Sequence, residues 1–253
     1  MTVSVTAAMA RGNALLDELF GSDLDELLSS LHEVDLPVGA VLQEPGKPVD
    51  AVLFPVKGVL SLVVELEDDA TVEAVTVGRE GMLGLSVFLG APTPTERATV
   101  LVAGRALALT VTEFARQVSI PDGPLERALR RHAAAMFTQL ARNAACNRVH
   151  TVRQRAARWL LMTADRTDGA RFALTQDFLA QVLAVRRASV NEVARALAED
   201  GCLTYTRGTI IVLDRAQLEN NACSCYKALA RHGGSQQNVG KNSQHMTHRR
   251  PPN

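Results

Sequence analysis

The sequence has little cysteine, and what it has is unevenly placed. All four cysteines lie in the second half of the 253-residue chain, at Cys146, Cys202, Cys223 and Cys225. Their spacing matches no common disulfide framework, so we expect a reduced, cytoplasmic protein. The chain also lacks a long apolar run: its longest uncharged stretch has 15 residues, whereas a membrane-spanning helix needs about 20. The N-terminus lacks the basic start and sustained apolar core of a signal peptide.

The short motifs that mark common enzyme classes are absent as well. The chain contains no G-x-S-x-G nucleophile elbow, no phosphate-binding P-loop and no H-E-x-x-H zinc motif. No pair of carboxylates lies in a setting typical of acid–base catalysis. We therefore expect a protein that is not an enzyme.

Charge is balanced in total but not along the chain. The 27 basic and 27 acidic side chains cancel. Residues 1–124, however, hold 7 basic and 18 acidic side chains, whereas residues 125–253 hold 20 basic and 9 acidic ones. This split indicates two domains with different partners, one of them a polyanion. The apolar share of 47% is enough for one or two hydrophobic cores.

Hydrophobic patterning separates a β-rich first half from a helical second half. Leucines at three- and four-residue spacing predict a helix over residues 13–35. From residue 36 to residue 111, valine-rich segments of five to eight residues alternate with turns. That rhythm predicts an antiparallel sandwich or barrel. No helical segment recurs between these strands, which argues against a parallel α/β sheet.

A long helix is predicted to begin after Pro124. Its apolar residues fall close to a heptad stripe, consisting of Leu125, Leu129, Ala133, Met136, Leu140 and Ala144. A stripe of this length predicts that the helix pairs with a second copy of itself. The alternative is that the stripe packs on the chain's own β domain, and both arrangements can hold at once.

Residues 175–203 have the pattern of a helix-turn-helix. Thr175 can cap a first helix, residues 183–185 form a tight turn, and a second helix begins near Arg187. Two short strands around a turn at Arg207 then predict a β wing. In a helix-turn-helix, the second helix enters the major groove of DNA with its N-terminal side chains on base edges.

The second predicted helix carries side chains suited to reading DNA. Arginine can grip guanine with two hydrogen bonds, asparagine can grip adenine in the same way, and serine can contact a base or a phosphate. The predicted DNA-binding residues are Thr175, Arg186, Arg187, Ser189, Asn191, Glu192, Arg195 and, at the tip of the wing, Arg207. The alternative is a three-helix subdomain with a solvated arginine face.

This order of segments resembles the Crp/Fnr family of bacterial transcription regulators. The likeness spans roughly residues 15–215, and its most specific parts are GREGMLGLSVFLG with the following ERATV, and the helix-turn-helix segment. The family implies an α+β fold with a jelly-roll-like antiparallel β-roll sensor domain, similar to cyclic-nucleotide-binding domains. We expect that domain over residues 13–123, a dimerisation helix over 124–150, a winged helix-turn-helix domain over 151–226 and a disordered tail over 227–253.

The resemblance also implies partners and roles. It implies a homodimer that reads a two-fold symmetric site on double-stranded DNA, and we expect RNA polymerase as a further partner. Arg187, Ala188 and Glu192 occupy the positions that most often read bases in the family. Ala184 replaces a frequent glycine of the turn, so it carries modest strain if the turn needs a positive φ. The expected dimer contacts are Leu125, Leu129, Met136, Leu140 and Ala144.

The effector positions depart from the family pattern. In members that bind cyclic AMP, a Gly-Glu pair at a short helix and a later arginine hold the phosphate and the ribose. The matching positions are Gly84, Leu85 and Arg97, and those facing the adenine are Leu140 and Ala141. Leucine cannot accept a hydrogen bond from a ribose hydroxyl, so ordinary cyclic AMP recognition is not expected. Arg97 still allows a small anionic or nucleotide effector, although a surface charge is the plainer interpretation.

Cysteine chemistry offers a weaker signal near the end of the chain. Cys223 and Cys225 form a C-x-C pair that could bind zinc or act as a redox switch, with Cys202 and His232 as possible neighbours. We favour the plainer interpretation, small buried or partly exposed residues on a terminal helix. The histidines show no metal-ligand spacing, so no metal site is predicted.

These patterns predict a homodimeric, sequence-specific DNA-binding regulator whose N-terminal domain responds to an effector. One alternative is a cyclic-nucleotide-type sensor module whose C-terminal domain docks a protein instead of DNA. Another is a constitutive regulator whose sensor site is no longer used.

Overall fold

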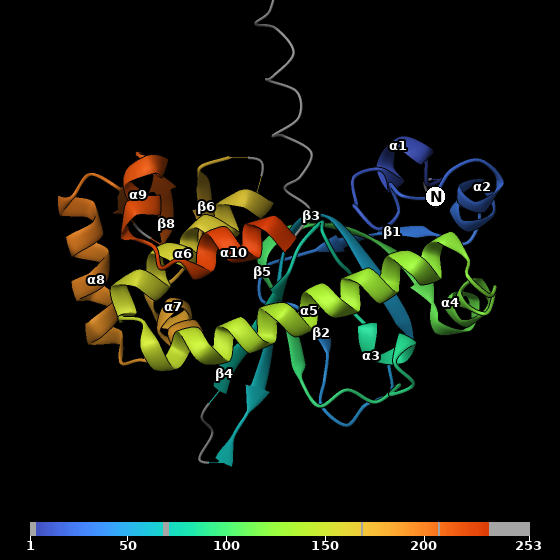
Figure 1. Cartoon of the computed structure of the whole chain (residues 1–253), viewed down its shortest axis with the longest axis horizontal. Coiled ribbons are helices and arrows are strands. Elements are labelled where there is room, and N and C mark those ends of the chain that lie inside the picture. The colour runs from blue at the N-terminus through green and yellow to red at the C-terminus, as the bar shows by residue number, and fades with distance from the viewer. Residues whose placement is uncertain (1–3, 68–70, 168, 207, 233–253) are drawn as a thin grey trace, which may run out of the picture.

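Two structural units lie side by side along one long helix (Figure 1). The computed structural model describes residues 4–67, 71–167, 169–206 and 208–232, and every structural statement refers to these residues. The β-rich unit contains the N-terminal part of the chain, and a smaller, mainly helical unit contains the C-terminal part. None of the helices within these ranges is long and apolar enough to cross a membrane.

The N-terminal unit is built on antiparallel strands. In chain order they are β1 (His32–Leu36), β2 (Val41–Gln43), β3 (Ala51–Glu65), β4 (Thr71–Val77) and β5 (Arg97–Thr110). The hydrogen-bonded order is β1-β5-β3-β4, and β2 also pairs with β5. This arrangement confirms the antiparallel β fold predicted from the valine-rich segments.

The two long strands bend together at a pair of glycines. Gly58 in β3 has a φ of +96°, and a Cβ built on Gly104 in β5 would lie 2.0 Å from the carbonyl oxygen of Lys57. The register between β3 and β5 also shifts here. Because only glycine permits this approach, the pair lets the strands fold over into a roll that encloses a core.

The helix predicted over residues 13–35 is wrong. The structure has two short helices, α1 (Ala7–Ala10) and α2 (Ser22–Leu28), and β1 already starts at His32. Gly21, with a φ of +57°, begins α2, and the side chain of Asn13 organises the turns before it. The Asn13 amide donates to the carbonyl oxygens of Pro55 and Gly81 at 2.9 and 2.8 Å. The leucines of this segment are nonetheless buried in one core with the roll, except Leu28, which is half-buried.

Three further helices belong to this part of the chain. The short α3 (Leu85–Phe88) lies between β4 and β5, and α4 (Val111–Val118) and the long α5 (Pro124–Val149) come after β5. The first turns of α5 bury Leu125 and Leu129 in the same core as Phe54 and Phe114. This corrects the expected dimer contacts, because these two leucines are used in packing on their own β-roll. Further along, Met136 is half-buried against the roll, whereas Leu140 and Ala144 are exposed.

The C-terminal unit has mixed helices and a small sheet. Its elements are α6 (Val152–Arg166), β6 (Arg171–Ala173), α7 (Gln176–Leu183), α8 (Arg187–Glu199), β7 (Leu203–Thr206), β8 (Thr209–Val212), α9 (Arg215–Asn221) and α10 (Cys225–His232). The sheet order is β6-β8-β7. Trp159 and Leu160 of α6 lie at the centre of its core.

Helix α10 corrects the expected start of the tail, because residues 227–232 are helical. Tyr226 and Leu229 are buried on one side of α10, and the Tyr226 hydroxyl donates to the Asp165 carboxylate in α6 at 2.9 Å. This packing holds the segment as a helix. The rest of the predicted tail, residues 233–253, lies outside the described residues.

The two units share a buried interface. Val59 and Leu101 of the roll belong to the same apolar cluster as Trp159. The Trp159 indole donates to a carboxyl oxygen of the buried Glu73 in β4 at 2.7 Å, and Arg166 forms an ion pair with Glu80 at 2.8 Å. These contacts fix how the C-terminal unit sits on the roll.

Candidate nucleic-acid interface

Helices α7 and α8 form the predicted helix-turn-helix. The Thr175 hydroxyl accepts a hydrogen bond from the Phe178 backbone N–H at 3.2 Å and caps α7. The chain then reverses within three residues, and α8 begins at Arg187 with Arg186 as its N-cap. Val190 and Leu197 are the buried residues of α8, so the opposite face is left for solvent.

The turn between the helices is left-handed at a residue other than glycine. Ala184 has φ 49° and ψ 51°, and its Cβ is exposed. The Ala184 N–H donates to the Gln181 carbonyl, and the Val185 N–H donates to the Ala180 carbonyl, which closes the end of α7. The positive φ anticipated for this turn is therefore present, with an alanine where glycine would be unstrained.

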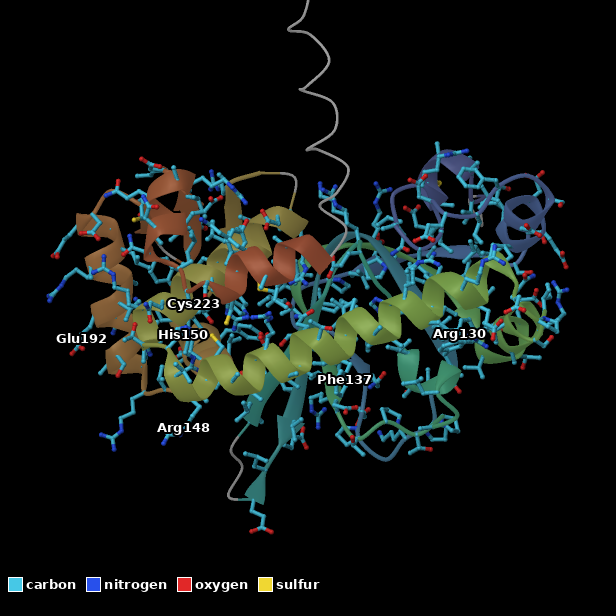
Figure 2. The ribbon with its side chains drawn as sticks, in the orientation of Figure 1. Arg130, Phe137, Arg148, His150, Glu192 and Cys223 are labelled. Atoms are coloured by element: carbon cyan, nitrogen blue, oxygen red, sulfur yellow. The ribbon has the colours of Figure 1, made fainter. Side chains whose placement is uncertain are left out.

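The predicted reading face of α8 points away from the rest of the molecule. Figure 1 shows α8 at the outer edge of the C-terminal unit, and Figure 2 shows Glu192 directed outward from it. Of the residues predicted on α8 and its N-cap, all are exposed except Ser189, which is half-buried: Arg186, Arg187, Ala188, Asn191, Glu192 and Arg195. The residues predicted from the sequence therefore lie on a surface that a ligand can reach.

Two of these arginines already have carboxylate neighbours. Arg187 lies 3.2 Å from Asp177 of α7, with exposed fractions of 62% and 69% for the two side chains, and Arg195 lies 3.6 Å from Glu199. Ion pairs this exposed contribute little to stability and exchange readily with a competing anion. The guanidinium groups therefore remain available to bases or phosphates.

The strands after α8 form the predicted wing. Strands β7 and β8 pair from Leu203–Val212 to Thr206–Thr209. The Tyr205 hydroxyl donates to the Leu174 carbonyl at 3.0 Å, and the Leu174 N–H donates to Gly208 at 2.8 Å, so the wing is tied to the residue just before the cap of α7. Arg207, the predicted phosphate contact, lies outside the described residues.

The residues predicted for effector binding differ in how available they are to a ligand. Gly84 caps α3 with a φ of +91°, and Leu85 packs partly buried against the core of the roll. Arg97 donates to the Glu65 carboxylate, and Glu65 together with Glu44 raises the pKa of the Arg97 guanidinium above its ordinary value. The guanidinium considered for an anionic effector therefore already faces acidic groups.

Sequence patterning missed an exposed aromatic residue of α5. Phe137 is 73% exposed and lies on the open side of the helix in Figure 2, whereas the heptad stripe passes through its half-buried neighbour Met136. Ala141 and Ala144 are exposed at four- and seven-residue steps from Phe137. A second stripe at helical spacing was the signal that could have located this face.

The structure also corrects the neighbours expected for the C-x-C pair. Cys202 lies elsewhere, in the main core of the C-terminal unit, where the Asn221 amide contacts its sulfur at 3.4 Å. Instead, Cys146 and His150 at the end of α5 lie with Cys223 and Cys225 in one group. The side chain of His232, the other expected neighbour, lies outside the part of the chain that the structure describes. Cys146 and Cys223 are 77 positions apart in the sequence, so motif spacing did not reveal this group.

Comparisons with known proteins agree with this architecture. Residues 154–220 match the family model for the Crp-like helix-turn-helix domain. FixK2 from Bradyrhizobium japonicum is a similar solved structure, with a TM-score of 0.66 and 17% identity over 77% of this chain and 98% of that one. A putative Crp/Fnr-family regulator from Eubacterium rectale has a TM-score of 0.64 and 14% identity over 83% and 98%.

A third similar structure is a CRP-family transcriptional regulator from Thermus thermophilus, with a TM-score of 0.63 and 19% identity over 75% of this chain and 96% of that one. No curated protein sequence matches the chain. The structure combines a β-roll unit with a winged helix-turn-helix domain whose second helix is exposed. The resemblance drawn from the sequence is confirmed at the level of the fold: residues 154–220 match the Crp-like helix-turn-helix domain, and the chain has the fold of the similar Crp/Fnr-family structures.

Proposed function

We propose that the chain acts as a homodimeric, sequence-specific DNA-binding transcription regulator. The observation that carries the proposal is the outward face of α8, where Arg187, Asn191 and Arg195 are exposed on a helix that only its apolar side attaches to the protein. Arginine and asparagine at such positions can each make paired hydrogen bonds to a purine in the major groove. Residues Ser189 and Thr175 lie beside this face and could contact the DNA backbone.

The open side of α5 supports the dimer. Phe137 is 73% exposed and Leu140 is 40% exposed, and small exposed alanines follow them along the helix. A large aromatic side chain in water gains free energy when it is buried against a partner. We propose a second copy of α5 as that partner, which would present two α8 helices to half-sites about 34 Å apart.

The decisive experiment selects bound sequences from random double-stranded DNA and then measures affinity for the selected site. We expect a two-fold symmetric site and a steep loss of affinity with salt. Arg187→Ala should weaken binding to that site about 5- to 150-fold, the equivalent of one lost base contact of about 1–3 kcal/mol. Arg105→Ala is the matched control, since Arg105 is similarly exposed and paired with Glu33, but lies on the β-roll.

The competing functions predict other outcomes of the same experiment. A C-terminal unit that docks a protein would enrich no DNA sequence. A non-specific binder would lose affinity equally with both arginine variants. Either result would contradict the proposed reading role of α8.

We also propose that any effector of the β-roll acts through the interface with the C-terminal unit. The links from Trp159 to Glu73 and from Arg166 to Glu80 join α6 to the sensor, so a ligand that shifts β4 would reorient α8. Leu85 and the Glu65 partner of Arg97 both disfavour a ribose phosphate. Cyclic AMP should therefore leave the melting temperature unchanged, while a panel of other nucleotides and small anions tests for an effector; if none binds, the regulator is constitutive.

A further inference from the structure

Four potential metal ligands meet where the long helix joins the DNA-binding unit. Cys146 and His150 are one helical turn apart at the end of α5. Cys225 is the first residue of α10, and Cys223 lies two positions before it. Figure 2 shows His150 and Cys223 next to each other at this junction. One ligand atom from each of the four lies within 4.8 Å of the other three.

Two of the separations are close to those of ligands around a single ion. The sulfurs of Cys146 and Cys223 are 3.5 Å apart, and the Cys225 sulfur is 3.9 Å from Nδ1 of His150. A tetrahedral zinc ion with bonds of about 2.3 Å to sulfur and about 2.0 Å to nitrogen separates its ligands by roughly 3.5–3.8 Å. An iron–sulfur cluster would spread its ligands over several irons and hold them further apart.

The surroundings of the group supply the charge that such a site needs. Three thiolates and one divalent cation leave a net charge of −1, which is costly to bury without a counter-charge. Arg155 and Arg158, both buried in α6, interact electrostatically with the Cys146 sulfur. Within the described residues, the Nε atoms of these two arginines are buried without a hydrogen-bond partner. Outer-shell groups orient metal ligands and tune the site, and these two N–H donors can do so here.

Cys202 shows what an ordinary buried cysteine looks like in this chain. It is surrounded by the apolar core of the C-terminal unit, among residues such as Leu203 and Leu218. The buried cysteines Cys146, Cys223 and Cys225, by contrast, form a separate cluster of their own. Three buried thiols gathered with an imidazole within 4.8 Å of one another favour ligation over packing.

We propose that Cys146, His150, Cys223 and Cys225 form a Cys₃His site for one zinc ion. The ion would tie the end of α5 to the segment between α9 and α10. The chain passes from α5 to α6 at Thr151, whose side chain and Gln154 form a capping box. Zinc at this point would therefore hold the angle between the long helix and the DNA-binding unit.

The test measures metal directly on the full-length protein, purified under reducing conditions. Elemental analysis should find about one zinc per chain in the wild type. After exchange with cobalt, the protein should show the thiolate-to-metal charge-transfer and ligand-field absorption of a tetrahedral Cys₃His site. Cys223→Ser and Cys225→Ser should lose tight metal binding, whereas Cys202→Ser, a buried cysteine outside the group, should keep it.

Folding is monitored separately, so that an unstable variant does not decide the question. A strong chelator should lower the melting temperature of the wild type and of the Cys202→Ser variant, but not that of Cys225→Ser. Sub-stoichiometric zinc in the wild type, iron with labile sulfide, or a Cys146–Cys223 disulfide under reducing conditions would each overturn the proposal. None of these readouts depends on DNA binding, so they leave the proposed function to its own test.

Discussion

Replacing Ala184 with glycine should stabilise the protein. A left-handed conformation costs a residue with a Cβ about 1–2 kcal/mol, and Ala184 has φ 49° and ψ 51°. Glycine removes that cost but adds chain entropy to the unfolded state, worth about 0.4–1 kcal/mol in the opposite direction. The Ala184 side chain is exposed, so little packing is lost. The expected net gain is about 0.5–1 kcal/mol.

Thermal unfolding can resolve this gain. For a domain of this size, about 1 kcal/mol shifts the melting temperature by roughly 2–4 °C, so Ala184→Gly should melt about 1–4 °C higher than the wild type. Ala198→Gly is the matched control, because Ala198 is also exposed but lies in the last turn of α8. Glycine in a helix is unfavourable by up to about 1 kcal/mol, so this variant should melt lower.

Equal destabilisation by the two glycine substitutions would refute the reasoning. It would mean that Ala184 is not left-handed in solution and that the turn between α7 and α8 has another conformation. Affinity for the selected DNA site provides a second check, because Ala184→Gly leaves the backbone of the turn and the start of α8 in place. A large loss of affinity would also count against the assigned turn.

Three further substitutions test the remaining contacts. Phe137→Glu should convert a dimer to a monomer in light scattering. Phe20→Glu, which changes another phenylalanine with 65% exposure, should leave the dimer intact. A dimer that survives Phe137→Glu would exclude this face of α5 as the dimer interface. Arg166→Ala leaves the Glu80 carboxylate without its partner and should lower the free energy of unfolding by about 2–4 kcal/mol in urea, somewhat less than a fully buried pair because Glu80 is partly exposed. Arg116→Ala, in an exposed pair, should change it little. Glu73→Gln should raise the melting temperature at pH 8 and leave it nearly unchanged at pH 4.

The elements that the sequence predicted well are those whose pattern is local. The alternation of valines located the strands, and the cap, tight turn and apolar stripe located α7 and α8. The reading face of α8 followed because helical periodicity places Arg187, Asn191 and Arg195 off the buried side. The strain at Ala184 was expected only if the turn needed a positive φ, and the structure has φ +49° there.

The predictions that failed concern segments whose conformation or partner depends on tertiary contacts. The leucines of residues 13–35 have helical spacing, yet Gly21 and the Asn13 side chain divide the segment into turns, a short helix and a strand. The stripe of α5 is real, but its first half serves the roll, so pairing with the chain's own core competes with pairing between copies. Composition suggested that the tail starts at residue 227, whereas Leu229 and its neighbours complete a buried helix.

The candidate metal group shows a different limit. The C-x-C pair was visible in the sequence, but its partners Cys146 and His150 are brought to it only by the fold. A spacing of four residues, Cys then His, places both ligands on one face of a helix. The sequence therefore contains both pairs of ligands, Cys146 with His150 and Cys223 with Cys225, but it does not show that the two pairs lie together.

The interface between the two units contains carboxylates that oppose each other in pH dependence. Burial raises the pKa of Glu73 above its ordinary value, even though Ser61, Trp159 and the nearby charges of Arg166 and Arg158 act against it. Burial also acts on Glu80, but the charge and hydrogen bonds of Arg166 outweigh it and lower that pKa. The two groups therefore affect stability on opposite sides of pH 4.5, the ordinary value for both.

The sign for Glu73 follows from proton binding. Above pH 4.5 the unfolded chain has lost the Glu73 proton while the folded chain retains it, so the free energy of unfolding falls as the pH rises through the folded pKa. Glutamine keeps the indole contact through its oxygen and meets Ser61 through its amide, without a charge to desolvate. Glu73→Gln should therefore remove this decline, and thermal melts between pH 4 and pH 8 measure it. A variant that melts lower than the wild type at pH 8 would show that Glu73 is held as a stabilised carboxylate by Arg158 and Arg166, and that the charge network, not burial, governs the interface.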